Sequence, residues 1–198
     1  RSFSTAAAET ISTGRAEVEA RELVSIHKAF TGVTTISLLN GRRRNPLCSS
    51  TMAQLEQALY GAAACRETRA VLLRGEGPAF SAGHDLRELQ AAAALPDEAA
   101  RKAALQAIFE QCGALMRAIR SVPVPVLAAV HGPAHAAGCQ LIAACDLVVA
   151  ERAHATFATP GVRLGLFCHT PATSVVQALG GGAGGARRAA KMLYTGQA

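Results

Sequence analysis

The stretch Phe-Ser-Ala-Gly-His-Asp-Leu, residues 80–86, follows a short apolar strand and opens a helix. A second stretch, Val-His-Gly-Pro-Ala-His-Ala-Ala-Gly-Cys-Gln at residues 130–140, makes the same passage after the apolar run 124–130. The first N–H groups of a helix have no partner within it, and the helix dipole favours negative charge there. Two such ends converging on one point would form an oxyanion hole, able to hold a thioester oxygen as it becomes an enolate. Packing requirements explain the same two junctions equally well.

Strand patterns lie on both sides of these stretches. Residues 23–26 and 33–39 are two β-like runs around Thr31-Gly32, which predicts a hairpin. Residues 70–73 form a short apolar strand, and residues 124–130 are apolar on both faces, which predicts a fully buried strand. Short strands are also expected at 147–150 and 156–158.

Helical patterns alternate with these strands. Ser49, Ser50 and Thr51 are expected to cap a helix whose apolar residues recur at spacings of three and four. Residues 98–120 carry one continuous apolar face and predict a long helix, and further helices are expected at 136–144 and 172–179. The alternation of strands and helices predicts an α/β fold with much parallel sheet.

Length and composition exclude several classes of protein. The chain has 198 residues, about one domain, and half of them are hydrophobic, so it can bury a core. No apolar stretch reaches the roughly 18–20 residues of a membrane-spanning helix. The net charge is +6, but five of the positive charges come from Arg1, Arg15 and the run 42–44. No basic stripe is interleaved with aromatic residues, which argues against nucleic-acid binding.

The six cysteines are scattered without a CxxC pair, which favours reduced, mostly buried thiols and an intracellular compartment. The first residues, Arg-Ser-Phe-Ser-Thr-Ala-Ala-Ala, are rich in serine and lack acidic residues. Residues 1–21 are therefore interpreted as a leader, either the end of a mitochondrial transit peptide or an ordinary disordered segment. Residues 22–198 are expected to form the folded domain.

Four other patterns have simple structural explanations. The glycine run 180–185 fits GxGxxG but follows a helical pattern, so a flexible loop is expected there. His131 and His135 have Gly132 and Pro133 between them, so they cannot share a helix face as metal ligands, and no metal site is predicted.

Two nucleophile patterns are explained in the same way. Ser81, His84 and Asp85 have the residue types of a hydrolytic triad, but triads bring together distant parts of a chain. Cys168 and His169 are adjacent in sequence, and adjacent side chains usually point apart, so a buried thiol is expected at Cys168.

At the two stretches 80–86 and 130–140 the sequence resembles the crotonase (enoyl-CoA hydratase/isomerase) superfamily. The resemblance runs through Thr-Thr-Ile-Ser-Leu-Leu-Asn (34–40), Gly-Cys-Gln-Leu-Ile-Ala-Ala-Cys-Asp (138–146) and Phe-Ala-Thr-Pro-Gly (157–161), and covers about residues 22–198. It implies a crotonase-type spiral of ββα units and, for the complete protein, homotrimers or hexamers closed by a C-terminal helical region that this chain is expected to lack. Three segments resemble a mitochondrial subgroup, which favours the transit-peptide interpretation and a matrix role in fatty-acid metabolism.

The resemblance also implies a set of ligand-binding residues. The backbone N–H groups of His84 and Ala137 correspond to the family's oxyanion hole, although the family often has glycine at the second position. Residues implied to contact an acyl-CoA thioester are Arg44, Ala82, Gly83, His84, Asp85, Leu86, Ala137 and Gly138. The arginines 42–44 are expected either to face the CoA phosphates or to form a solvated loop. No cofactor other than CoA within the thioester is implied.

The catalytic side chains depart from the family pattern. Hydratases use two glutamates to activate water and protonate the α-carbon, and the corresponding residues here are Gln140 and Gly161. An amide cannot abstract a proton at neutral pH and glycine has no side chain, so hydration by the usual route is not expected. Cys168, His135 and His169 are the nearest substitutes as proton carriers.

Three hypotheses remain open from the sequence. One is a CoA-thioester lyase, such as a decarboxylase, that needs only enolate stabilisation. Another is a non-catalytic, regulatory acyl-CoA binder. The last is a hydratase with residual activity that takes a carboxylate from the C-terminal part that this chain is expected to lack.

Overall fold

Repeated strand–strand–helix turns make up the fold in the computed structural model, which describes residues 21–180 and 182–197. Each turn consists of a longer strand, a strand of two residues and one or two helices. After β1 (Val24–Lys28), the turns are β2 (Val33–Leu38), β3 (Pro46–Leu47), α1 (Ser49–Ala64); β4 (Ala70–Gly75), β5 (Gly83–His84), α2 (Leu86–Ala93), α3 (Glu98–Ser121); β6 (Val126–Val130), β7 (Ala134–His135), α4 (Ala137–Ala144); and β8 (Leu147–Ala150), β9 (Phe157–Ala158), α5 (His169–Ala178), α6 (Gly182–Thr195). Short 3₁₀ helices η1 (Gly41–Arg43) and η2 (Pro160–Leu164) precede β3 and α5.

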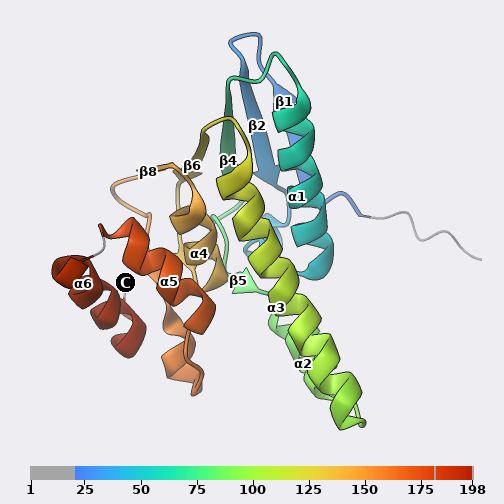
Figure 1. Ribbon diagram of the computed structural model, residues 1–198, viewed down its shortest axis with the longest axis vertical. Coiled ribbons are helices and arrows are strands. Elements are labelled where there is room, and N and C mark those ends of the chain that lie inside the picture. Colours follow the sequence, from blue (N-terminus) through green and yellow to red (C-terminus); the bar gives the residue numbers. More distant parts are fainter. Residues whose placement is uncertain (1–20, 181, 198) are drawn as a thin grey trace, which may run out of the picture.

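The longer strands form one sheet in the order β1-β2-β4-β6-β8. The hairpin β1–β2 is antiparallel and every other neighbouring pair is parallel. The two-residue strands pair separately, β3 with β5 and β7 with β9, both in parallel. Figure 1 shows α1, α3 and α4 side by side on one face of the larger sheet. The predicted α/β fold, its parallel sheet and the spiral of ββα units are confirmed.

The core lies between that sheet and its helices. Val71 and Leu73 of β4 and Val126, Ala128 and Val130 of β6 are buried among the helices. The alternate residues of β6, 127 and 129, are only half-buried, so the prediction of a strand buried on both faces is wrong. The reason is that helices cover one face of the sheet and leave the other partly open.

Helix α1 starts where its sequence pattern predicts but is capped differently. Its N-cap residue is Cys48, without a side-chain hydrogen bond, so the expected cap by residues 49–51 is wrong. The Glu88 carboxylate of α2 instead accepts from the Ser49 N–H at 3.0 and 3.2 Å. A carboxylate from another helix thus pairs the free amide at this positive helix end.

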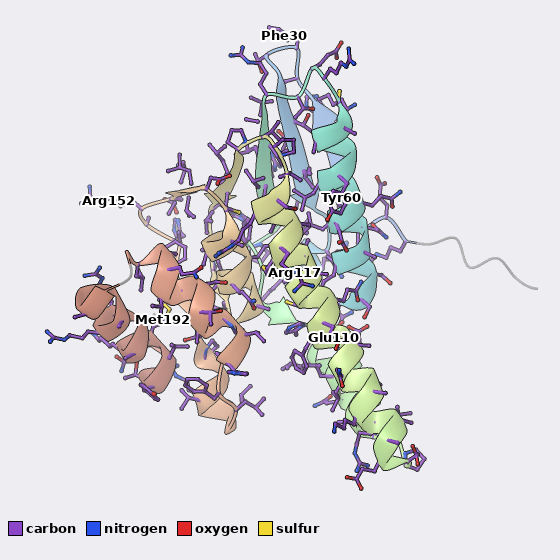
Figure 2. The ribbon with its side chains drawn as sticks, viewed as in Figure 1. Phe30, Tyr60, Glu110, Arg117, Arg152 and Met192 are labelled. Atoms are coloured by element: carbon purple, nitrogen blue, oxygen red, sulfur yellow. The ribbon has the colours of Figure 1, made fainter. Side chains whose placement is uncertain are left out.

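The long helix predicted at 98–120 is confirmed as α3. Its buried face includes Ile108, Cys112, Leu115 and Ile119. Figure 2 shows Glu110 and Arg117 on its outer side, and both side chains are exposed.

The glycine run does not form the expected loop beyond Gly180, because α6 begins at Gly182. Ala189 and Leu193 of α6 pack against Val175 of α5 and Cys139 of α4, and this contact outweighs the low helix propensity of glycine. A helix, α5, precedes the run, so the context of a dinucleotide-binding turn is missing.

The structure also bears on the predicted leader and on membrane-spanning helices. Residues 1–20 of the predicted leader lie outside the described residues. Within the described part, no helix is both long enough and apolar enough to cross a membrane.

Candidate functional site

The structure brings the two strand-to-helix junctions side by side. The Ser81 N–H donates to the Pro133 carbonyl at 3.2 Å, and the His135 N–H donates to the Ser81 carbonyl at 2.9 Å. These bonds join the segment before β5 to the segment that becomes β7 and α4. Residues 81 and 134 consequently form a parallel bridge.

Gly83 lies where the two junctions approach each other closely. Its φ is +92°, and a Cβ built on it would lie 2.9 Å from the Ala137 nitrogen and 2.9 Å from the Ala136 Cβ. Only glycine allows both this backbone conformation and this approach. His84 and Ala137, which the family resemblance assigns to the oxyanion hole, therefore lie on segments in direct contact.

The Ala137 N–H is unpaired within the part of the chain that the structure describes. Ala137 is the first residue of α4, where an N–H has no partner inside the helix. Among the described residues, no hydrogen bond from this N–H is present, whereas the Ala136 N–H donates to the Ala158 carbonyl at 2.9 Å.

The His84 amide points away from its neighbouring strand. In the β3–β5 pair, Pro46 lies opposite Gly83 and Leu47 opposite His84. Proline has no N–H, so the pairing at Pro46 must run through the N–H and C=O of Gly83. Because successive residues of a strand direct their amides to opposite sides, the His84 N–H faces away from β3.

Ala136, which precedes the free Ala137 amide, has a strained backbone. Its φ of 50° and ψ of −121° are unusual for a residue with a side chain. Such conformations cost on the order of 1–3 kcal/mol and concentrate at functional sites. The strain sets the direction in which the chain enters α4 and thus the direction of the Ala137 N–H.

Asp85 stabilises the start of the second helix at the site. Its carboxylate accepts from the Arg87 N–H at 3.0 Å, which caps α2, and it also pairs with Arg43 at 2.8 and 3.0 Å. The sequence pattern assigned Asp85 to the ligand pocket but did not predict its ion pair with Arg43. Aspartate followed closely by a helix was the available signal for the cap.

The other predicted contact residues differ in exposure. Ala82 and Leu86 are exposed, and the Ala82 N–H donates to the Arg44 carbonyl at 2.8 Å. Gly138 is buried, and a Cβ there would clash with the Ser81 carbonyl oxygen, so only glycine fits at this position.

The Arg44 side chain is exposed, and its charge reaches β7. Burial is the larger cause that lowers the pKa of His135, and the positive charge of Arg44 lowers it further. Arg44 is therefore a cation close to the segment that leads into α4.

The His84 side chain is enclosed beside the site. Phe109 of α3 packs edge-on against its ring at 5.2 Å between centroids. Among the described residues, neither ring nitrogen has a hydrogen-bond partner. Burial lowers the pKa of His84, while the Leu47 carbonyl and the Glu88 carboxylate oppose this effect, so the imidazole is neutral at pH 7.

Gln140 is one of the two residues that the family resemblance aligns with the glutamates of hydratases. Its side chain is 5% exposed on α4, one turn after Ala137. Its Oε1 atom has no partner within the described part of the chain. A buried neutral amide can hold a hydrogen bond at this position but cannot act as a base.

Gly161 is the other of these two residues, and the sulfur of Cys168 fills the space beside it. A Cβ on Gly161 would lie 2.8 Å from Cys168 Sγ and 3.0 Å from the Leu166 carbonyl oxygen. The Gly161 N–H donates to the same sulfur at 3.3 Å. A glutamate side chain therefore has no room here unless Cys168 is changed.

The alternative catalytic patterns are not assembled. Ser81 Oγ donates to the Asn45 carbonyl at 2.8 Å and Asp85 pairs with Arg43, so neither side chain contacts the His84 ring. His131 Nε2 bonds the Gly77 carbonyl at 2.6 Å, and His135 Nε2 bonds Thr156 Oγ1 at 3.1 Å. Across residues 21–180 and 182–197, no group of three or more potential ligands could hold a metal ion.

A cavity of about 710 Å³ lies at the carboxyl ends of β4, β6 and β8. Arg74, His131 and Glu151 contribute to its lining, and no predicted ligand-contact residue does. The paired junctions, rather than this cavity, bring the predicted residues together.

The spiral of strand–strand–helix turns and the two paired junctions define a crotonase-type protein. A family model described as enoyl-CoA hydratase/isomerase matches residues 28–198, and the chain belongs to this family.

Individual relatives agree with the subgroup suggested by the sequence. The mitochondrial enoyl-CoA hydratase domain-containing protein 3 of Mus musculus is 39% identical over 186 residues, which are 94% of this chain and 58% of the mouse protein. The human protein of the same name is 38% identical over 184 residues, 93% of this chain and 56% of its own length. The chain thus spans little more than half the length of these curated relatives.

Solved structures show the same likeness. The crystal structure of human enoyl-CoA hydratase domain-containing protein 3 has a TM-score of 0.78 and 36% identity, covering 89% of this chain and 64% of that one. An enoyl-CoA hydratase of Mycobacterium smegmatis has a TM-score of 0.79 and 38% identity, with the same coverage of both chains.

Proposed function

We propose that this protein binds an acyl-CoA thioester and holds the thioester oxygen between the backbone N–H groups of His84 and Ala137. The observation that carries the proposal is the close approach of Gly83 to the Ala137 nitrogen. It places the two amide-bearing segments together at the start of a helix, where the dipole favours a developing negative charge. Membership of the enoyl-CoA hydratase/isomerase family supports a CoA thioester as the ligand.

Hydration by the usual two-carboxylate route is not part of this function. Gln140 and Gly161 stand where the family pattern has its glutamates, and each general acid or base contributes about 10²–10⁴-fold to a rate. Cys168 fills the space beside Gly161, and its sulfur accepts from the Gly161 N–H at 3.3 Å. The primary role is therefore acyl-CoA binding with polarisation of the thioester.

A decarboxylase of carboxyacyl-CoA thioesters is the second candidate. Its substrate carries a second carboxylate, which requires a cation near the thioester. The observation that favours it is the place of Arg44, an exposed cation whose carbonyl accepts from the Ala82 N–H at 2.8 Å, two residues before His84. Loss of carbon dioxide would leave its electron pair on the α-carbon as an enolate, which two amide donors stabilise without a carboxylate base.

The cellular setting follows from the named relatives and the leader pattern. Several curated relatives are named as mitochondrial proteins, and the first eight residues are rich in serine and lack acidic residues, which fits the end of a transit peptide. We place the protein in the mitochondrial matrix, in fatty-acid metabolism. The complete protein is expected to form homotrimers or hexamers, with no cofactor beyond the CoA of its ligand.

Removal of the Ala137 amide tests the proposal. Ala137→Pro deletes one N–H at the first position of α4, where the amide has no partner inside the helix. Butyryl-CoA affinity, measured by calorimetry, is expected to fall at least about tenfold, since one donor is lost from a preorganised pair. Glu98→Pro is the matched control, because Glu98 holds the same first position in α3. Equal affinities in the two folded variants would contradict the proposed site.

A further inference from the structure

Arg43 makes the ion pair nearest to the proposed oxyanion hole. Its Nη2 atom lies 2.8 and 3.0 Å from the two carboxylate oxygens of Asp85. The Asp85 side chain is 10% exposed and that of Arg43 is 39% exposed, so the pair is partly shielded from water. A guanidinium and a carboxylate at these distances form a charge-assisted hydrogen bond.

Asp85 directly follows His84 in the chain, so a movement of the Asp85 side chain also shifts the backbone of the proposed oxyanion hole. The same carboxylate caps α2 by accepting from the Arg87 N–H at 3.0 Å. Rotation of Asp85 would therefore disturb both the helix start and the peptide plane beside it. Arg43 restricts that rotation.

The other side of His84 is fixed by a different set of bonds. The Ala82 N–H donates to the Arg44 carbonyl at 2.8 Å, and Ser81 Oγ donates to the Asn45 carbonyl at 2.8 Å. Asn45 Nδ2 in turn donates to the carbonyls of Glu76, Ala79 and Phe80 at 2.9–3.1 Å. These bonds hold the chain before His84, and the Arg43–Asp85 pair holds it after His84.

The loop 43–45, which carries these contacts, has a strained backbone that the contacts stabilise. Arg44 and Asn45 have φ values of 61° and 49°, in the left-handed region that residues with side chains seldom adopt. The loop is thus bent so that the Arg43 side chain and the 44–45 carbonyls all meet the segment 81–85.

We propose that Arg43 is a positioning residue for the oxyanion hole, which fixes the His84 N–H through Asp85, and is not a ligand of the CoA phosphates. This rests on the proposed function. Of the three arginines in the run 42–44, Arg43 is the one whose guanidinium bonds the hole segment. Its loss misaligns a backbone donor and leaves the rest of the CoA contact surface in place.

Two ligands that differ only in the carbonyl oxygen test the proposal. Butyryl-CoA has the thioester oxygen, and S-butyl-CoA, its thioether, lacks it. The dissociation constant of the thioether divided by that of the thioester measures the carbonyl contact separately from the CoA contact. In Arg43→Gln this ratio is expected to fall on the order of tenfold relative to the unaltered chain, with little change in thioether affinity.

Infrared spectroscopy of butyryl-CoA with a ¹³C-labelled carbonyl gives an independent readout at saturation. Hydrogen bonds from the hole lower the carbonyl stretching frequency, and the shift is expected to shrink in Arg43→Gln. Arg43→Lys is expected to recover part of the shift, because lysine retains the charge but not the planar geometry. Arg42→Gln is the matched control, since it removes one charge from the same loop and is expected to retain the ratio.

Each result has a defined meaning. Equal losses for thioester and thioether in Arg43→Gln would overturn the proposal and indicate a phosphate contact. An unchanged ratio and an unchanged carbonyl shift would also overturn it. If the unaltered chain binds the thioester no better than the thioether, the proposed function itself is contradicted, and the role of Arg43 with it.

Discussion

The backbone donors at His84 and Ala137 and the side-chain positions 140 and 161 all belong to the candidate site. The chemistry of the first pair depends on the backbone, and that of the second pair depends on side chains. At the first, the functional groups are backbone N–H donors, aimed by strand pairing, a glycine at φ +92° and a strained residue before α4. At the second, the family pattern relies on carboxylate side chains, and this chain has an amide at 140 and no side chain at 161.

The difference shows how a site can keep its binding function and lose its acid–base chemistry. Substituting a side chain leaves its residue's N–H in place, so an alanine at 137 or a histidine at 84 still offers a donor. A carboxylate, by contrast, disappears with one substitution, and a neighbour such as Cys168 then fills its space. Under the proposed function, polarisation of a thioester therefore depends on groups that side-chain substitutions leave in place.

Blocking the backbone region is expected to have the largest effect. Gly83→Ala places a methyl group 2.9 Å from the Ala137 nitrogen at a φ that alanine rarely adopts. Butyryl-CoA affinity is expected to fall on the order of a hundredfold. The unfolding free energy should fall by about 1–3 kcal/mol, measured in urea.

Gly61→Ala is the matched control for that change. Gly61 lies within α1, and no atom lies within 4 Å of a Cβ built there. Alanine is expected to stabilise the helix by about 0.5–1 kcal/mol and to leave affinity unaltered. Wild-type affinity in Gly83→Ala would mean that the two junctions do not form the ligand site.

Restoring glutamate at residues 140 and 161 is expected to have an intermediate effect, which is measured as hydration activity. Gln140→Glu with Gly161→Glu restores both residue types, but the second side chain meets Cys168 Sγ at 2.8 Å. Adding Cys168→Ala removes that sulfur. Crotonyl-CoA hydration, followed by enoyl absorbance, is expected to be at least about tenfold faster in the triple variant than in the double variant. Equal rates in the two would show that Cys168 does not obstruct the vacated position.

The smallest expected effect is the pH dependence of stability near the hole. Burial lowers the pKa of His84 below its ordinary value of 6.5, so below pH 6.5 the unfolded chain binds more protons than the folded one. The unfolding free energy should therefore decrease on acidification from pH 7 to 5, with a slope from this group of up to about 1.4 kcal/mol per pH unit.

His84→Phe should reduce that slope in urea unfolding series. His27→Gln, at an exposed ring on β1, is the control expected to leave it unaltered. An equal slope in the chain with and without His84 would show that its imidazole is not enclosed as described.

The main elements of this fold could be predicted from local patterns. Apolar runs and a 24-residue amphipathic helix, α3, follow from residue periodicity, as does the hairpin β1–β2. The start of α6 in a glycine run could not be predicted, because it depends on packing of Ala189 and Leu193 against α4 and α5. The cap of α1 by Glu88 could not be predicted either, because Glu88 and Ser49 are 39 residues apart and meet only in the folded chain.

In the candidate site too, features set by local sequence could be predicted and features set by the folded chain could not. The two junctions and the residue types at 140 and 161 are visible in the sequence, since motifs keep their spacing. The Arg43–Asp85 pair and the placement of Cys168 beside Gly161 are not, because each joins segments whose relative position only the folded chain defines.

Crotonyl-CoA binding, followed at once by heat and by enoyl absorbance, tests the central claim most directly. The account predicts saturable binding to the protein without loss of the enoyl double bond, because the amide donors are present and the two carboxylates are not. Turnover at the rate of an ordinary hydratase, or no binding at all, would contradict it.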